Sequence, residues 1–194
     1  MTTTEFKIIE EPQKPLSMHP KKFALWLFIA SVVMLFASLT SAYIVREAEG
    51  NWVYFELPQL FYVTSVIVIL SSITLQLAYI AAKKDDLQKV KLWIVLTSIF
   101  GVAFLVGQFM AWKDLVLNSI YLVGNPSGSF LYIITGLHAL HVVSAVVFLF
   151  VVLGAAFKFN VHSKKLSQME MCLTYWHFLS VLWLYLFVFL LMTR

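Results

Sequence analysis

Charged residues are scarce in this sequence, and their scarcity excludes an ordinary soluble domain. Asp, Glu, Lys and Arg together make up 12% of the 194 residues, whereas hydrophobic residues make up 61%. A typical soluble domain is about 25% charged and about 45–50% apolar. The apolar excess is too large for one buried core, so the composition predicts a chain that is solvated by lipid.

Cysteine and membrane-depth carboxylates are also lacking. Cys172 is the single cysteine, which excludes an internal disulfide and a CxxC metal site. No Asp or Glu interrupts any long apolar run, although proton pumps and ion-coupled transporters usually keep at least one there. The sequence also has no Gly-rich phosphate loop and no nucleophile beside a plausible base. These absences argue against independent transport or catalysis by this chain.

Five long apolar runs dominate what the sequence does contain. A helix needs about 20 apolar residues, at about 1.5 Å each, to cross about 30 Å of hydrocarbon. The runs predict membrane-spanning helices at about residues 23–45, 60–82, 92–112, 130–157 and 171–193. The sequence therefore predicts an all-α polytopic membrane protein, with a polar tail at 1–22 and a five-helix membrane domain at 23–194.

Lysine and arginine residues predict how the helices are oriented. The tail, the second loop and the fourth loop carry 11 of them, whereas the opposite side carries only Arg46, Lys113 and Arg194. The positive-inside rule thus predicts a cytoplasmic N-terminus and a periplasmic C-terminus. Because the basic residues separate apolar runs and form no patch, the net charge of +4 does not indicate nucleic-acid binding.

Small and hydroxyl residues predict which helix faces meet protein, because they let helix backbones approach closely. They recur on one face of each of the first four predicted helices: Ser31, Ser38 and Ala42; Ser65, Ser72 and Gln76; Thr97, Gly101 and Gln108; Thr135, His138 and Val142. We expect a bundle with these polar groups paired inside, although a partner subunit could also cover some of the stripes.

Three histidines lie at or near membrane depth, where polar side chains are often functional. His138 and His141 are three residues apart and share a helix face, and His177 lies in the last predicted helix. One interpretation is a haem b held by His177 and one histidine of the pair. A metal site needs three or four ligands, and membrane-depth carboxylates and thiolates are almost absent. The spacing favours a third interpretation, hydrogen bonding between helices or to lipid headgroups, and leaves the other two open.

Two sequence motifs resemble signatures of one family. Residues 130–142, FLYIITGLHALHV, are similar to the TGxHxxHV signature of cytochrome c oxidase subunit III. Residues 170–187, EMCLTYWHFLSVLWLYLF, resemble the final helix of that family, with a Glu seven residues before the His of YWHF. Weaker similarities, in the same order as in the family, extend the resemblance from about Trp26 to Phe187.

The resemblance implies a non-catalytic accessory subunit of a bacterial haem–copper terminal oxidase, in its short five-helix form, in the bacterial inner membrane. Members of the family contact the catalytic subunit I, support its proton uptake and durability, and bind phospholipid. Haems and copper are then expected in partner subunits and none in this chain, which also has no predicted catalytic or metal-binding residue. The candidate structural, lipid or subunit contacts are Thr135, His138, His141, Glu170, Trp176 and His177.

Three positions depart from the family pattern. Val32, Ala111 and Ser180 stand where the family often has a carboxylate at membrane depth. A family role in proton handling that needs those carboxylates is not expected here, whereas a scaffold role is. The alternatives are a related subunit of a nitric oxide reductase or a ubiquinol oxidase, or a small haem b membrane anchor ligated through His177.

Overall fold

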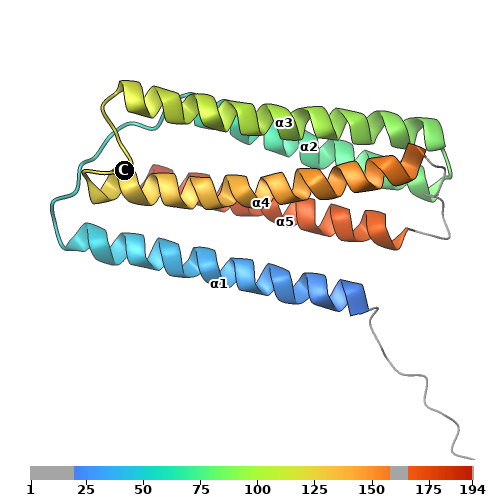
Figure 1. Ribbon diagram of the computed structural model, residues 1–194, viewed down its shortest axis with the longest axis horizontal. Helices are drawn as coiled ribbons and strands as arrows, with labels where there is room; N and C mark the ends of the chain where they lie inside the picture. Colours follow the sequence, from blue (N-terminus) through green and yellow to red (C-terminus); the bar gives the residue numbers. More distant parts are fainter. Residues whose placement is uncertain (1–19, 158–165, 194) are drawn as a thin grey trace, which may run out of the picture.

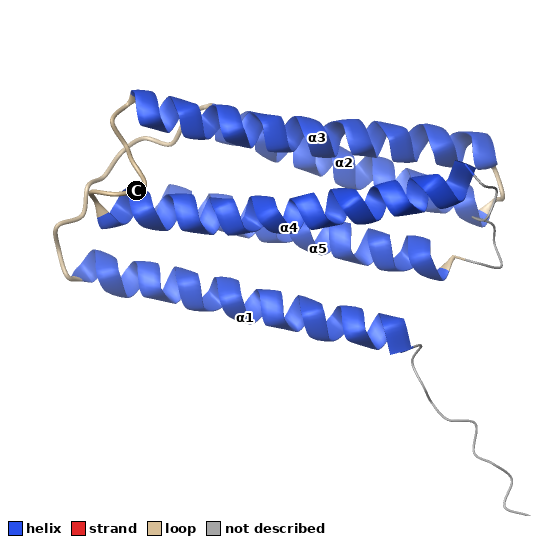
Figure 2. Cartoon of the chain, viewed as in Figure 1, coloured by secondary structure: helices blue, strands red, loops and turns tan. Residues whose placement is uncertain are grey.

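The computed structural model describes residues 20–157 and 166–193, and the regular structure in these ranges is α-helical throughout (Figure 1, Figure 2). In chain order the helices are α1 (Pro20–Ala48), α2 (Leu60–Lys83), α3 (Leu87–Leu117), α4 (Pro126–Phe157) and α5 (Ser167–Met192). Each of these five helices is long and apolar enough to cross a membrane. The all-α five-helix fold predicted from the sequence is confirmed.

The helices extend beyond the apolar runs that predicted them. α3 exceeds its predicted span by more than a turn at each end, and Asp86 caps its start by accepting a 3.2 Å hydrogen bond from the backbone N–H of Lys89. α1 begins at Pro20. Proline, which has no backbone N–H, suits the first turn of a helix, because an N–H there would have no partner within the helix. Lys21 and Lys22, predicted in the tail, are therefore helical. The remaining tail residues, the basic loop at 158–165 and Arg194 lie outside the described residues.

Four of the helices form the core of the bundle, and α1 lies against one side of it (Figure 1). Contacts run from α2 to α3, α3 to α4, α4 to α5, and α5 back to α2, which closes a ring. α1 contacts only α4 and α5. α4 and α5 are therefore the central helices: α4 touches α1, α3 and α5, and α5 touches α1, α2 and α4.

Aromatic rings fill the centre of the ring of helices. The indole of Trp183 in α5 stacks on Phe61 of α2 with ring centroids 5.8 Å apart, and Phe104 of α3 meets that indole edge-on at 5.1 Å. Gly101 lets α3 come close to α5, because a Cβ atom at this position would lie 2.7 Å from Cη2 of Trp176. Close packing of this kind replaces the hydrophobic effect as the force that joins helices inside a membrane.

The predicted inward stripe on α1 is wrong within this chain, and cover of that stripe by a partner subunit stays a prediction. Ser31, Ser38 and Ala42 are exposed, and the two serine hydroxyls donate to the carbonyls of Phe28 and Leu35 in their own helix. The face of α1 that packs against the bundle is instead made by Ile29, Val32, Phe36, Thr40 and Tyr43. A serine that bonds its own backbone needs no partner helix, so its presence does not mark a contact face.

The stripes on the next three helices do lie at contacts. Thr97, Gly101 and Gln108 of α3 are buried, as are Thr135, His138 and Val142 of α4. On α2, Ser65 is buried. Ser72 is half-buried and Gln76 is exposed, but both bond to His177 of α5.

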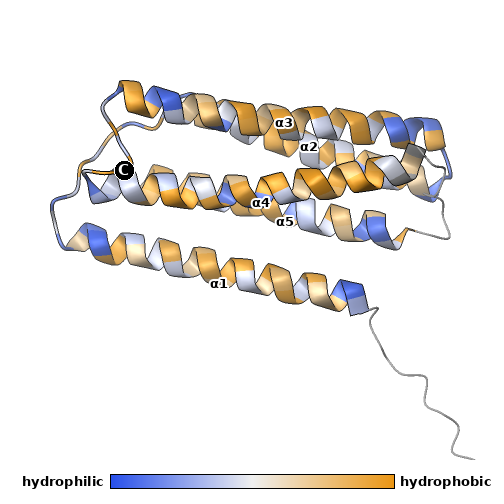
Figure 3. Ribbon diagram, in the orientation of Figure 1, coloured by the Kyte–Doolittle hydropathy of each residue, from blue (hydrophilic) through white to orange (hydrophobic). Residues whose placement is uncertain are grey.

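Hydrophilic residues gather towards the helix ends, whereas apolar residues predominate along the helices between them (Figure 3). The described basic residues at one end of the bundle are Lys21, Lys22, Lys83, Lys84, Lys89 and Lys91. Arg46 and Lys113 lie at the opposite end. The fold thus brings the basic segments together, and the side of the membrane that they face stays a prediction.

Candidate functional site

His177 joins α5 to α2 through both of its ring nitrogens. Nε2 lies 3.1 Å from Oε1 of Gln76, and Nδ1 is hydrogen-bonded to Oγ of Ser72. The two α2 residues are four apart and therefore share a face. An amide oxygen can only accept, so Nε2 donates its proton to Gln76. The imidazole is thus a bridge between two helices.

Two tryptophans of α5 hold the same seam farther along. Nε1 of Trp176 donates to Oγ of Ser71 at 3.1 Å, and Nε1 of Trp183 donates to Oγ of Ser65 at 3.0 Å. The buried indoles therefore have partners for their N–H groups, as large amphipathic rings in a core require. Along the α2–α5 seam, His177, Trp176 and Trp183 of α5 thus each bond to different polar residues of α2.

The α2–α3, α3–α4, α4–α5 and α1–α5 seams each have a polar pair of their own. Oγ1 of Thr74 and Oγ1 of Thr97 lie 2.8 Å apart between α2 and α3. Nε1 of Trp112 donates to Oγ1 of Thr135 at 3.1 Å between α3 and α4. The remaining pairs, Ser144 with Tyr175 and Thr40 with Tyr185, join α4 and α1 to α5. Polar groups are thereby distributed over the whole bundle and do not converge on one centre.

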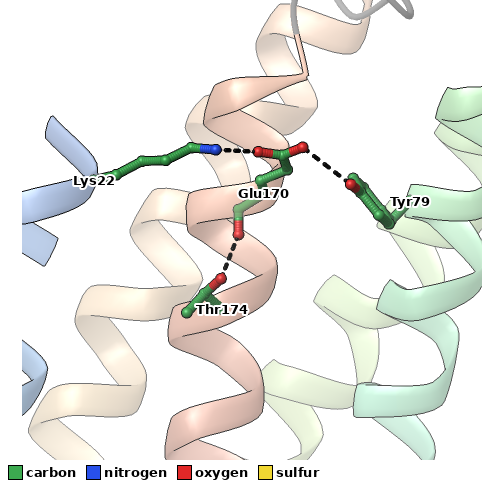
Figure 4. A network of polar contacts seen from close by, with 4 residues as sticks. All are labelled: Lys22, Tyr79, Glu170 and Thr174. Carbon is green, nitrogen blue, oxygen red and sulfur yellow. Dashed lines mark hydrogen bonds and ion pairs between the residues drawn. The ribbon is translucent and has the colours of Figure 1, made fainter. Parts of the chain in front are cut away.

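Glu170, in the first turn of α5, ties three helices together (Figure 4). One carboxylate oxygen is paired with Nζ of Lys22 from α1, and the other accepts a 3.0 Å hydrogen bond from the hydroxyl of Tyr79 on α2. The hydroxyl of Thr174 donates to the backbone carbonyl of Glu170 at 2.8 Å. Beside this network lies a hollow of about 280 Å³ lined also by Trp26.

The paired histidines of α4 both contact Phe36 of α1 but otherwise have different neighbours. Nδ1 of His141 lies 2.7 Å from the carbonyl of Leu137, and its ring meets Phe28 and Phe36 of α1 at centroid distances of 6.2 and 5.8 Å. His138 is fully buried and stacks on Trp183 of α5 at 5.0 Å.

The structure therefore does not bring His177 together with either histidine of α4, because the ring of His177 bonds to α2. Among the described residues, no group of three or more His, Cys, Asp or Glu side chains lies close enough to hold a metal ion.

The three positions that lack the family carboxylate lie in the packed interior. Val32 is 2% exposed and Ala111 is fully buried, while the hydroxyl of Ser180 donates to the carbonyl of Trp176 at 2.9 Å. Apolar packing or a bond to the helix's own backbone replaces the polar group at each position.

Some partners in these networks were not predicted from the sequence. Lys22 and Tyr79 belong to no motif, and Trp183 lies in the motif at 170–187 but was not among the candidate contacts. The roles of all three depend on which helices are neighbours. The available signal was the lone carboxylate near the start of the last apolar run, which needs a cation or a donor when it is partly buried.

Comparisons with known proteins agree with the sequence motifs. The family model described as cytochrome c oxidase subunit III matches residues 13–193. A protein of Corynebacterium diphtheriae named cytochrome c oxidase subunit 3 is 31% identical over 169 residues, which cover 83% of this chain and 82% of that protein. The probable cytochrome c oxidase subunit 3 of Nocardia farcinica is 32% identical over 168 residues, and these cover 83% and 82% of the two chains. The corresponding protein of Mycobacterium tuberculosis is 28% identical over 171 residues, with 82% and 81% covered.

Proposed function

This chain belongs to the cytochrome c oxidase subunit III family, and from this premise we propose that it stabilises the catalytic subunit I of a bacterial haem–copper terminal oxidase and supports its proton uptake. The chain is a multi-pass membrane protein, and as a subunit III it assembles with other oxidase subunits. In this proposal the complex lies in the bacterial inner membrane and reduces oxygen to water, and the chain itself catalyses no step.

The observation that carries the proposal is how the polar side chains are used. His177, Trp176 and Trp183 hold α5 against α2, and Glu170 connects α5 to α1 and α2. Hydrogen bonds of this kind stabilise a bundle and leave its outer faces for neighbouring subunits and lipid. Engagement of both ring nitrogens of His177 supports placing the haems and copper in partner subunits.

Support of proton uptake is proposed to act through contact with subunit I. The membrane-depth carboxylates of the family pattern are replaced here by Val32, Ala111 and Ser180, so this chain has no carboxylate at these positions to relay a proton. A rigid neighbour can still hold the entry to a proton path of subunit I in one conformation.

We also propose that phospholipid occupies the hollow beside Glu170. The ammonium of Lys22 is paired with Glu170 but has further N–H donors for a phosphate, and Trp26 is 56% exposed, as an interfacial aromatic side chain would be. Native mass spectrometry of the purified complex tests this: Lys22→Ala should reduce retained phospholipid, and unchanged retention contradicts lipid binding at this hollow.

Deletion of the chain tests the main proposal. We expect the haem spectrum of the remaining oxidase to be retained, while the enzyme loses activity faster during turnover or assembles in lower yield. Complete loss of the oxidase haems after deletion would contradict a stabilising subunit and indicate an assembly factor.

A visible spectrum of the purified single chain tests the haem b alternative. We expect no Soret band. A Soret band that is lost in His177→Ala would reject the proposal that this chain holds no haem.

A further inference from the structure

Gln108 and His138 are the unsatisfied polar pair in the described part of the bundle. Both side chains are fully buried, and neither their amide atoms nor their ring nitrogens have a hydrogen-bond partner among the described residues. Buried polar atoms are almost always hydrogen-bonded, to protein or to ordered water, because leaving them unpaired is costly. Each of these two side chains therefore requires a partner.

The two side chains lie at the same level of neighbouring helices. On α3, Gln108 is one turn from Phe104 on one side and one turn from Trp112 on the other. The ring of Phe104 lies 5.9 Å from the ring of His138, and Nε1 of Trp112 bonds to Oγ1 of Thr135, which is one turn before His138 on α4. Gln108 therefore lies, along the axis of α3, at the level of the turn of α4 between Thr135 and His138.

Two polar groups beside His138, the indole of Trp183 and the hydroxyl of Thr135, already have partners. Nε1 of Trp183, whose indole stacks on His138, donates to Oγ of Ser65. The hydroxyl of Thr135 donates to the carbonyl of Leu131 at 2.7 Å and accepts the indole proton of Trp112. Trp183, Thr135, Gln108 and His138 line what we call the His138 compartment. Among these side chains, only Gln108 and His138 still require hydrogen bonds.

Aromatic rings surround the imidazole of His138 on its other sides. Phe36 of α1 and Phe104 of α3 meet it edge-on at centroid distances of 6.4 and 5.9 Å, and Trp183 covers one of its faces. These rings cannot replace two conventional hydrogen bonds, and they separate the compartment from the lipid-facing surface.

We propose that an internal water molecule bridges His138 and Gln108 at the α3–α4 seam. A water molecule can donate two hydrogen bonds and accept two, a neutral imidazole has one donor and one acceptor, and an amide side chain has both. Internal waters of proteins make about three hydrogen bonds to groups that are otherwise unsatisfied. One water therefore matches the chemistry of both side chains, whichever ring nitrogen carries the proton.

A structure of the purified oxidase complex, at a resolution that shows ordered water, tests the proposal. We expect a solvent peak within hydrogen-bond distance of His138 and Gln108. A direct bond between the two side chains, or a compartment without a peak, would overturn it. In Gln108→Met, which removes the amide but keeps the length of the side chain, the peak should be lost while the helices keep their positions.

A double-mutant cycle gives an independent readout. If water bridges the two groups, Gln108→Met and His138→Phe each leave one polar side chain with a weakened partner, so each should lower the melting temperature of the complex. The double variant should then melt higher than the sum of the single effects predicts. If no water bridges Gln108 and His138, each single variant should instead raise the melting temperature or leave it unchanged, and the effects of the two substitutions should add.

Vibrational spectra distinguish a water bridge from a direct bond, because both would show coupling in the cycle. Exchange into H₂¹⁸O should shift an O–H stretching band that is absent from His138→Phe and Gln108→Met. Ser98→Ala is the matched control, because its buried hydroxyl bonds only the carbonyl of Ile94 in its own helix, and the band should persist in it. Identical ¹⁸O-sensitive spectra in the wild type and in both variants would overturn the water bridge.

Discussion

Individual hydrogen bonds hold the seams of this bundle, and each contributes little free energy alone. Measured bonds of this kind in a membrane average about 0.6 kcal/mol and reach about 1.7 kcal/mol. The hydrogen bond of Trp183 has an effect beyond its own free energy, because the indole that it positions also stacks on Phe61 and on His138. The bond to Ser65 sets the position of a ring on which three helices pack.

Removing the Ser65 hydroxyl should therefore lower the free energy of unfolding more than removing a hydroxyl that bonds only its own helix. We expect Ser65→Ala to lower the free energy of unfolding by about 0.6–1.7 kcal/mol, because the buried Nε1–H of Trp183 loses its acceptor. Ser98→Ala is the control, since it removes only a bond to Ile94. Thermal unfolding of the purified complex measures both variants, and equal losses would show that the indole bond has no separate contribution.

At the scale of helices, α1 differs from the other four. It contacts α4 and α5 alone, and most of its residues outside one narrow face are exposed. α3, in contrast, approaches its neighbours closely at Gly101 and Gly107, where an added Cβ would lie 2.7 Å from Trp176 and 2.6 Å from Thr64. The core helices are thus joined by close packing, whereas α1 is joined by fewer and more local contacts.

Gly101→Ala should push α3 away from α5. A methyl group there overlaps the indole of Trp176 and presses on Val146, so we expect a loss of about 1–3 kcal/mol, the usual cost of overpacking a core. Gly136→Ala is the matched control, because nothing lies within 4 Å of its added Cβ. The melting temperature of the complex should fall for Gly101→Ala and not for Gly136→Ala, and similar values for the two would contradict the close approach.

Glu170→Gln should loosen the start of α1 without unfolding the core. The variant loses the ion pair with Lys22 but keeps an acceptor for the hydroxyl of Tyr79. Both charged side chains are more than a third exposed, so solvent screening limits the loss to at most about 1 kcal/mol. Hydrogen exchange should become faster in the first turns of α1 and stay unchanged in α3. Lys84→Ala serves as the charge control, and exchange that is equally fast in this control would argue against the ion pair.

At the scale of the whole molecule, the antiparallel order of the helices gathers the basic segments at one end. Lys22 of α1, Lys83 of α2 and Lys89 of α3 belong to different parts of the chain but share this end. Anionic headgroups of the cytoplasmic leaflet attract such a cluster. The charge distribution therefore predicts orientation, although the fold itself would be the same in either direction.

The predicted orientation can be measured with reporters fused to the C-terminus. Alkaline phosphatase is active only in the periplasm, so we expect activity from this fusion and none from a fusion in the α2–α3 turn. Replacing Lys83, Lys84, Lys89 and Lys91 by neutral residues should reduce the difference between the two fusions. The opposite pattern of activity would reverse the predicted topology.

The sequence by itself determined the number and type of the spanning elements, because the requirement for about 20 apolar residues acts locally along the chain. It also supplied the family, through the motifs around His138 and His177. Which side of each helix faces protein was decided only by the tertiary structure. Lipid and protein interior are equally apolar, and a hydroxyl can bond its own backbone, so Ser31 and Ser65 look alike in the sequence although one is exposed and the other buried. The same reason explains the histidines: their spacing was visible in the sequence, but only packing decided that His177 bonds to α2 while His138 stacks on Trp183 of α5 and His141 lies against α1.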